Sequence, residues 1–263
     1  MISIVIRNKN EAKALENILS IITDVYSGDY KEIIIVDNYS TDNSVEIALK
    51  YNCRVVNIKD FTYGRAINVG IEAAATKYVL LLSAHAIPVG TSFFKNTLAA
   101  LTANENIAGI RYINSIENYK RAVINNFKVL EPLDSGLMAA CALINKEVWA
   151  QFKFNEELVA IEDKEWSDRV VKNDFQIIDL NETYFYFIKR TVKGNIARYK
   201  NETIASNVLR QKEFLSTTVI WGSFLKNILF ANTKKYFESM NREFLLLKAK
   251  IEIQKQSKKK ASN

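Results

Sequence analysis

Short apolar runs alternate with stretches of helical spacing along the first 90 residues of the chain. The apolar runs predict buried strands at residues 2–6, 32–36, 54–58 and 78–83. Between them, the spacing predicts helices at 10–23, 44–51 and 68–75, the first capped by Asn10 and with one apolar face made of Leu15, Ile18, Leu19 and Ile22. Strands that alternate with helices form βαβ units, so the pattern predicts an α/β fold with a mostly parallel sheet.

The pattern changes twice further along the chain. From 91 to 188 it predicts helices at 92–102, 146–151 and 163–172 and strands at 107–112, 138–144 and 175–179. Beyond residue 203 the apolar spacing predicts helices only. We therefore expect an α/β domain at 1–195, a basic amphipathic helical extension at 196–255 and a disordered tail at 256–263.

Charge is divided unevenly along the chain. The net charge is +7, yet residues 189–263 hold 17 basic and 5 acidic residues, a balance of +12, which leaves −5 for residues 1–188. A basic appendage of this kind suits membrane lipid, nucleic acid or an anionic substrate. Composition alone does not choose among them.

Several classes of protein are excluded or disfavoured. The two cysteines, Cys53 and Cys141, cannot form a disulfide scaffold or a four-thiolate zinc site, so a reduced, cytoplasmic protein is expected. No apolar run approaches the roughly 20 residues that span a bilayer, and the N-terminus has no features of a signal peptide. Neither G-x-G-x-x-G nor a Walker A motif follows the first strand, which disfavours a dinucleotide-binding fold and a phosphate loop.

Polar residues follow each of the first four predicted strands. Ligands of an open α/β sheet bind at the carboxyl ends of its strands, so these residues are expected to share one cleft. They are Arg7, Asn8, Asn10, Glu11, Asp37, Asn38, Asp42, Asp60, Tyr63, Gly64, Arg65, Asn68, Ser83 and His85. The alternative for residues 37–42 is a turn that only caps the next helix.

Five segments, in order, carry a family resemblance. They are ISIVIRNKNEAKALENILSII, IIIVDNYSTDNSVEIA, YGRAINVGIEAAATKYVLLLSAHAIP, GLMAACALINKEVW and EDKEWSDRV. Over about residues 2–185 the chain resembles family 2 of the inverting glycosyltransferases. The resemblance implies a GT-A fold, which is Rossmann-like, a nucleotide-sugar donor, a saccharide or lipid-linked saccharide acceptor, and a place in the synthesis of surface polysaccharides such as capsule.

The same resemblance implies roles on the donor side. Asp37 matches the residue that bonds the nucleotide base, and Arg65 the arginine beside the nucleotide. A carboxylate accepts the imide N–H of uracil or thymine and a guanidinium matches phosphate, which favours UDP- or dTDP-sugars. A surface ion pair is the alternative for Arg65, and a simple turn for Gly64. The expected donor-binding set is Arg7, Asn8, Glu11, Asp37, Asn38, Gly64, Arg65, Ser83 and His85.

The metal motif departs from the family pattern. Most members carry Asp-x-Asp where this chain has Ser83-Ala84-His85. Either His85 ligates Mn²⁺ or Mg²⁺ beside the donor diphosphate, or it contacts phosphate directly or packs beneath the donor. In the second case Arg65 or basic residues of the extension supply part of the missing charge. The sequence leaves metal dependence open, and no organic cofactor is expected.

Catalysis is expected at Glu162 and Asp163. An inverting transfer needs one carboxylate to remove the proton of the acceptor hydroxyl, and Asp163 matches that base, with Glu162 beside it. The alternative is a pair of first-turn acids favoured by the helix dipole. Gly136 and Trp166 are expected on the acceptor side, although Trp166 fits a core residue equally well.

Two other functions and two roles for the extension follow from the same observations. The missing Asp-x-Asp motif fits a nucleotide-sugar-binding protein of the same fold without turnover. A nucleotidyltransferase shares a similar sheet but has a glycine-rich loop where this chain has RNKNEAK. The extension either docks at the inner face of the cell membrane or packs on the domain or on a second subunit, as a homodimer. Nucleic acid is not an expected partner.

Overall fold

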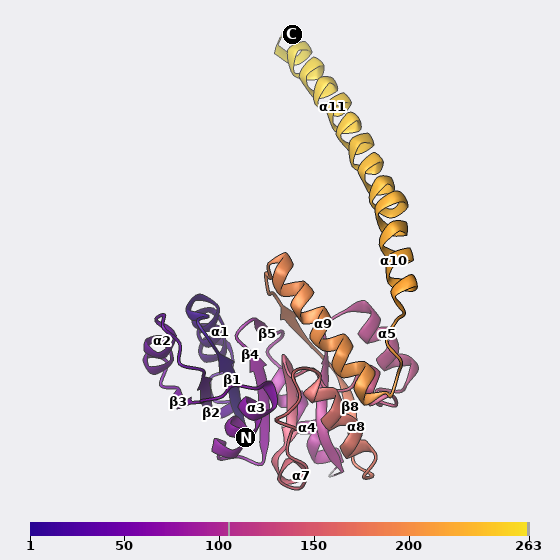
Figure 1. The fold of residues 1–263 in the computed structure, drawn as a ribbon. Coiled ribbons are helices and arrows are strands. Elements are labelled where there is room, and N and C mark those ends of the chain that lie inside the picture. The colour runs from indigo at the N-terminus through magenta and orange to yellow at the C-terminus, as the bar shows by residue number, and fades with distance from the viewer. Residues whose placement is uncertain (105, 262–263) are drawn as a thin grey trace. The chain divides into compact units, whose positions relative to one another are not determined.

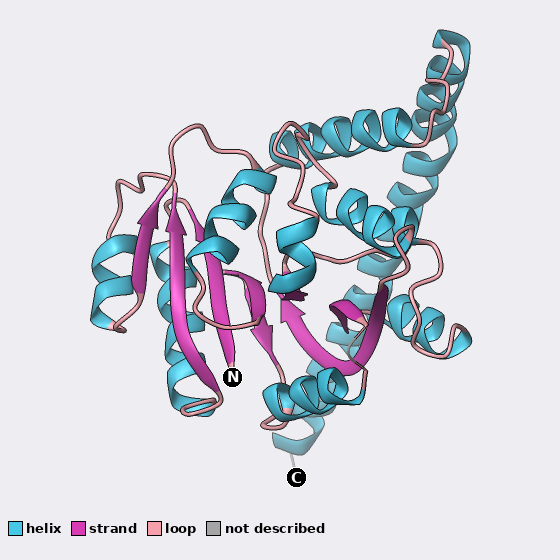
Figure 2. Cartoon of the chain, turned by 90° about the horizontal axis from the view of Figure 1, so that it is seen from below, coloured by secondary structure: helices cyan, strands magenta, loops and turns pink. Residues whose placement is uncertain are grey.

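A computed structural model describes the backbone of residues 1–104 and 106–261, with side chains as far as residue 252. The chain divides by its internal contacts into two units, Met1–Gln211 and Lys212–Asn263. The first unit holds an eight-stranded sheet with helices packed on it (Figures 1 and 2). The second unit is helical throughout its described length.

The first half of the sheet has four parallel strands joined by helices. The strands are β1 (Ile2–Asn8), β2 (Tyr30–Asp37), β3 (Arg54–Asn57) and β4 (Tyr78–Ser83), in the spatial order β3-β2-β1-β4. Helices α1 (Ala12–Val25), α2 (Ser44–Lys50) and α3 (Tyr63–Ala73) connect them. These elements confirm the predicted βαβ pattern, and they bring the carboxyl ends of four strands to one edge of the sheet.

The second half of the sheet is mixed. Next to β4 lie the antiparallel β7 (Cys141–Asn145), then β6 (Ile107–Ile113), β8 (Gln176–Tyr186) and, at the edge, β5 (Ala86–Pro88). Strand β8 runs parallel to β6 and antiparallel to β5. The helices here are α4 (Phe93–Ala103), α5 (Ile116–Ile124), α6 (Pro132–Ser135), α7 (Lys146–Gln151), α8 (Glu162–Val171) and α9 (Val192–Leu209).

Some elements differ from the predicted ones for identifiable reasons. Helix α3 begins five residues before the predicted 68 because the Thr62 hydroxyl accepts a hydrogen bond from the Arg65 backbone N–H, 3.1 Å, and caps it. Strand β8 continues past 179 because it pairs with β5, which was not predicted. Nor were α5 and α6. Asn10 does not cap α1: its φ is +52°, and the backbone N–H of Ala12 donates instead to Asp42, 3.0 Å.

Two apolar layers cover the two faces of the sheet. Alternate residues of β1 enter opposite layers, Ile4 and Ile6 on one face and Val5 on the other, and all three are fully buried. This double burial explains why the strands have continuous apolar sequences. Trp166 belongs to the second layer: it is 0% exposed and stacks on Phe154, with the ring centroids 5.0 Å apart.

The first unit ends later than the predicted boundary at 195. Helix α9 belongs to it, because Ala205 is buried and Arg210 donates hydrogen bonds to the Leu133 carbonyl, 2.8 Å, and to Asp134, 2.6 Å. The second unit contains α10 (Thr217–Lys226), a π-helical turn η1 (Asn227–Asn232) and α11 (Thr233–Ala261). The predicted disordered tail at 256–263 is therefore helical as far as Ala261, and 262–263 lie outside the described residues. Among the described helices, none combines the length and apolar character needed to cross a membrane.

Replacing Gly64 with alanine should destabilise the first unit. A Cβ at this position would collide with the carbonyl oxygen of Asn155, so one of two packed backbone segments must shift. Such overpacking costs about 1–3 kcal/mol of unfolding free energy, measurable by urea denaturation followed by circular dichroism. Gly222→Ala is the matched control, because a Cβ there meets nothing within 4 Å. Equal unfolding free energies for Gly64→Ala and the unaltered protein would contradict the steric argument.

Candidate active site

The carboxyl ends of β1 and β2 are joined by a buried hydrogen-bond cluster around Asp37. Its carboxylate accepts hydrogen bonds from the Asn8 amide, 2.9 Å, the Ser40 backbone N–H, 2.7 Å, and the Ser40 hydroxyl, 2.6 Å. Asp37 is only 1% exposed. The buried Asn8 side-chain oxygen, in contrast, has no partner. The cluster thus closes the turn after β2 around Asn38, while Asn8 keeps one unused acceptor.

The start of α3 presents an arginine at the same edge of the sheet. The Arg65 side chain is 42% exposed, and its nearest acids are Asp60 at 3.9 Å and Glu156 at 4.0 Å. Such half-exposed pairs are weak, so the guanidinium is available to an anion. Gly64 packs against the Asn155 backbone, where a Cβ atom would not fit. This close packing is sufficient to explain why the residue is a glycine.

Arg7 connects the end of β1 with the segment before β7. Its guanidinium donates a hydrogen bond to the Ala139 carbonyl, 3.1 Å, lies 3.7 Å from the Glu162 carboxylate and sits over the Tyr63 ring, 5.6 Å from the centroid. The Arg7 side chain is 16% exposed and that of Glu162 is 7% exposed. The cation and the acid therefore meet in a largely desolvated place.

Asp163 is held by the same residue, Ala139, through its backbone N–H. Its carboxylate accepts hydrogen bonds from the backbone N–H groups of Ala139 and Lys164, both at 2.9 Å. Ile161, directly before α8, has a φ of +58°, a conformation that β-branched residues rarely adopt. Strain of this kind persists only where the surroundings hold it, and here it orients the first turn of α8, which carries both acids.

Burial dominates the ionisation of the two acids. Desolvation raises the pKa of Glu162, and the neighbouring Asp163 carboxylate raises it further, while Arg7 opposes both effects. Desolvation also raises the pKa of Asp163, against the two backbone hydrogen bonds and Arg7. Because the two carboxyl groups are neighbours and both pKa values are raised, this pair holds a proton more readily than solvated carboxyl groups do. A pair of this kind can accept a proton at a higher pH than ordinary carboxylates.

The predicted metal position offers few ligands. His85 Nε2 lies 3.4 Å from a Glu11 carboxylate oxygen, and the Ser83 hydroxyl accepts a hydrogen bond from the His85 backbone N–H, 3.3 Å. Throughout the residues that the structure describes, no three His, Cys, Asp or Glu side chains come close enough together to hold an ion. Mn²⁺ and Mg²⁺ need about six ligands, so these residues do not make a metal site by themselves.

On the acceptor side, the structure corrects the prediction for Trp166 and shows how Gly136 is packed. Trp166 has no exposed surface, and its indole N–H donates to the Phe152 carbonyl, 2.5 Å, so it is a core residue and not a platform for a sugar. Gly136 is in close packing, since a Cβ there would lie 2.8 Å from the Ser167 hydroxyl. Its backbone lies against Ser167 of α8, and its place on the acceptor side stays a prediction.

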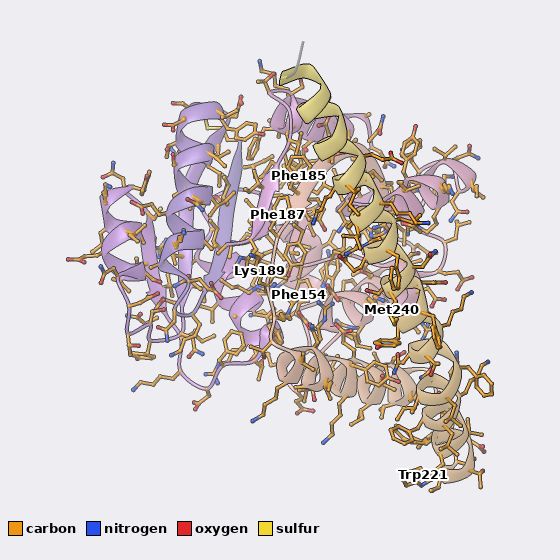
Figure 3. All side chains as sticks on the ribbon, turned by 90° about the horizontal axis from the view of Figure 1, so that it is seen from above. Phe154, Phe185, Phe187, Lys189, Trp221 and Met240 are labelled. Atoms are coloured by element: carbon orange, nitrogen blue, oxygen red, sulfur yellow. The ribbon has the colours of Figure 1, made fainter. Side chains whose placement is uncertain are left out.

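Sequence reasoning missed the aromatic side chains beside His85. The Phe187 backbone N–H donates to the His85 carbonyl, 3.0 Å, and the side chains of Phe185 and Phe187 are 53% and 65% exposed (Figure 3). Their ring centroids are 5.7 Å apart. The pairing of β5 with β8 brings them to His85, and no local pattern predicts a strand as short as β5. Ala139, which bonds both Arg7 and Asp163 through its backbone, gives no signal in its residue type.

The chain matches a known protein family over most of its first unit. Residues 3–171 match the family model described as "Glycosyl transferase family 2". No curated protein matches the chain significantly.

Solved structures of similar fold include three glycosyltransferases. The mannosyltransferase PcManGT of Pyrobaculum calidifontis, in complex with GDP-Man and Mn²⁺, has 16% identity over 82% of this chain and 66% of its own, with a TM-score of 0.64. Glucosyl-3-phosphoglycerate synthase of Mycobacterium tuberculosis, with Mn²⁺, UDP-Glc and phosphoglyceric acid, has 16% identity over 81% of each chain and a TM-score of 0.62. TarS 1–349 of S. aureus, with UDP-GlcNAc, has 16% identity over 72% and 59%, and a TM-score of 0.55.

At this level of identity the solved structures establish the fold alone, which is that of GT-A glycosyltransferases. The family model, in contrast, covers well over half of the residues. The chain belongs to glycosyl transferase family 2 and is therefore a glycosyltransferase.

Proposed function

We propose that the protein transfers a sugar, with inversion, from a nucleoside-diphosphate donor to a saccharide or lipid-linked saccharide acceptor. UDP- and dTDP-sugars are the favoured donors, and the proposed setting is the cytoplasmic synthesis of a surface polysaccharide such as capsule. One observation carries the proposal: at the carboxyl edge of β1 the buried acid Glu162 lies 3.7 Å from Arg7, and the neighbouring, partly buried Asp163 is fixed by the Ala139 backbone N–H. The donors in the similar structures, GDP-Man, UDP-Glc and UDP-GlcNAc, support the class of donor.

The proposed reaction is a single displacement. The acceptor hydroxyl oxygen attacks the anomeric carbon, the bond from that carbon to the diphosphate oxygen breaks, and the hydroxyl proton passes to Asp163. The two backbone hydrogen bonds keep the Asp163 carboxylate in one orientation. A fixed orientation suits a general base, because proton transfer requires the base and the hydroxyl to meet in a defined geometry. Glu162 and Arg7 adjust the proton affinity of that base.

On the donor side, we assign the nucleotide pocket to the edge formed by β1, β2 and α3. Asp37 already accepts three hydrogen bonds, so we assign it the support of the pocket through Asn8 and the turn that it closes. Arg65 is the exposed cation for the diphosphate. On the acceptor side, the exposed ring of Phe187 replaces Trp166 as the aromatic surface suited to a sugar.

A nucleotide-sugar-binding protein without turnover is the second candidate, because the Asp-x-Asp position lacks carboxylates and no three-ligand metal cluster occurs among the described residues. Incubation with UDP-, dTDP- and GDP-sugars, each with and without Mn²⁺, separates the two. Transfer or slow donor hydrolysis supports the transferase, and saturable donor binding with neither supports the second candidate. Absence of binding to every donor contradicts both, and pyrophosphate release from a nucleoside triphosphate and a sugar phosphate would indicate a nucleotidyltransferase.

Asp163→Asn should abolish most transfer and leave donor affinity intact. The amide keeps the shape of the side chain but cannot take a proton, and general base catalysis contributes about 10²–10⁴-fold to rate. The measurement is kcat with a saturating donor, beside donor affinity by calorimetry. Asp168→Asn is the matched control on the same helix, where the side chain pairs with Lys172 at 2.7 Å. Near-normal turnover by Asp163→Asn would remove this residue from the role and leave Glu162.

In the pH profile of kcat/KM, activity should fall on the acid side at a pH above about 4, the pKa of an ordinary carboxyl group. The base works only when deprotonated, and burial raises the pKa of both acids, so activity falls as pH drops through that raised pKa. In Arg7→Met the acid limb should move to still higher pH, because the guanidinium lowers both pKa values. Arg54→Met, at an exposed arginine, should leave the limb in place. A limb near pH 4 in the unaltered protein would refute the assignment.

Mn²⁺ should bind weakly to the free protein, at roughly millimolar affinity or worse, because His85 and Glu11 are the two ligands that the described residues offer at the predicted metal position. Added UDP supplies phosphate oxygens and should tighten the binding, and His85→Ala should reverse that gain. Electron paramagnetic resonance of free Mn²⁺ measures all three cases. Tight binding by the free protein would contradict the two-ligand description. No binding even with UDP would mean that basic side chains alone neutralise the diphosphate.

A further inference from the structure

The second unit carries a long row of apolar side chains that nothing within the unit covers. Every described side chain from Lys212 to Glu252 is exposed. Soluble proteins rarely leave this many large apolar side chains close together in water. Its large members include Phe214, Leu215, Val219, Ile220, Trp221, Phe224, Leu225, Ile228, Leu229, Phe230, Tyr236, Phe237, Met240, Phe244, Leu247 and Ile251.

The π-helical turn η1 brings two apolar stripes of this unit to one side. The stripe of α10 contains Trp221 and Phe224, and that of α11 contains Met240 and Phe244. In an uninterrupted α-helix, with its 3.6 residues per turn, the two stripes would face about 140° apart. Each residue of a π-helix rotates less about the helix axis than a residue of an α-helix does. Over the six residues of η1 the rotation is therefore smaller by roughly 100°, so the two stripes nearly align. Figure 3 labels Trp221 in α10 and Met240 in α11.

Charge makes the second unit different from the rest of the chain. Residues 212–263 contain eleven basic and four acidic residues, a balance of +7. The remaining 211 residues contain 25 of each, so the entire net charge of the protein belongs to the second unit. In α11, Lys248 and Lys250 flank the apolar stripe on either side. Their stems can cover apolar surface while the ammonium groups reach outward.

From these observations we propose that the second unit docks on an anionic lipid surface, with α10 and α11 lying in the interface. The aligned stripe enters the boundary between headgroups and acyl chains, and the basic residues contact the acidic headgroups. This docking does not depend on the transferase reaction proposed above. It concerns a different part of the chain and is tested without nucleotide sugars.

A second copy of the chain fits the same surface less well. The residues Phe237, Met240, Phe244, Leu247 and Ile251 follow the three-four spacing of a coiled coil. Continued toward α10, however, that spacing reaches Thr233, Phe230, Lys226 and Ser223, of which three are polar, and η1 interrupts the register. About two heptads remain, below the three or four that a stable coiled coil usually needs. A dimer would also place two units of charge +7 side by side.

Trp221 provides a built-in probe for the docking. Of the three tryptophans, Trp149 and Trp166 are 4% and 0% exposed in the first unit, whereas Trp221 is 60% exposed. The full chain is mixed with vesicles of phosphatidylcholine alone or of equal parts phosphatidylcholine and phosphatidylglycerol. We expect co-sedimentation with the anionic vesicles only, a blue shift of tryptophan emission on binding, and loss of both at high salt. Trp221→Phe should keep the binding and lose the blue shift.

Two pairs of variants test the stripe and the charge separately. Phe224→Glu/Ile228→Glu should abolish binding, and the control pair Leu49→Glu/Ile124→Glu, exposed in the first unit, should not. Lys234→Gln/Lys235→Gln should weaken binding roughly tenfold or more, because each basic residue near an anionic surface adds an appreciable share of the attraction. Lys31→Gln/Lys95→Gln removes the same charge from the first unit and should bind as the unaltered protein does.

Three results would overturn the proposal. The first is an unaltered protein that stays in the supernatant with anionic vesicles. The second is equal binding to neutral and anionic vesicles, since charge would then play no part. The third is a dimer in sedimentation equilibrium whose tryptophan emission is already blue-shifted in buffer and does not change with lipid, which would mean that a second copy covers the stripe.

Discussion

The contacts of Arg7 hold the candidate active site together. This one guanidinium joins the end of β1 to the Ala139 carbonyl, 132 positions away in sequence, and to Glu162 in the first turn of α8. The backbone N–H of Ala139 then fixes Asp163. A single residue of the segment before β7 thus touches the cation through its oxygen and an acid through its nitrogen. Any movement of Ala139 would alter both the charge balance and the orientation of the candidate base.

This arrangement is costly to stability and useful for chemistry. Glu162 loses most of its hydration and Asp163 part of it, Arg7 compensates the charge, and Ile161 is held in a left-handed conformation. Removing one partner of such a buried group leaves the others without compensation. The same imbalance raises the pKa of both carboxyl groups, since desolvation opposes their ionisation. A catalytic base gains from that shift, because a proton acceptor works best when its pKa approaches the working pH.

The sequence predicted the parallel half of the fold and the residues at its carboxyl edge. Each of those strands contains a local apolar run, and several of the site residues lie at the end of such a run, as Arg7 does in β1. Features that depend on distant contacts escaped prediction. The three residues of β5 form a strand only because β8 pairs with them. Trp166 gave no sign of which way it would face, since an aromatic residue at helical spacing suits a core and a sugar site alike. Gly64 and Gly136 looked like loop glycines beside a ligand, and both serve close packing.

The two units differ in how their apolar stripes are used, although the stripes have similar spacing. In α1, Leu15, Ile18, Leu19 and Ile22 are fully buried against the sheet. In α11, Met240 and Phe244 have the same spacing but remain exposed. Periodicity therefore predicts a helix and its apolar face, but it does not identify the surface that covers this face. Charge adds the missing information here. The first unit balances its basic and acidic residues, whereas the second combines uncovered apolar side chains with the whole excess of positive charge, so the surface that matches it is both apolar and anionic.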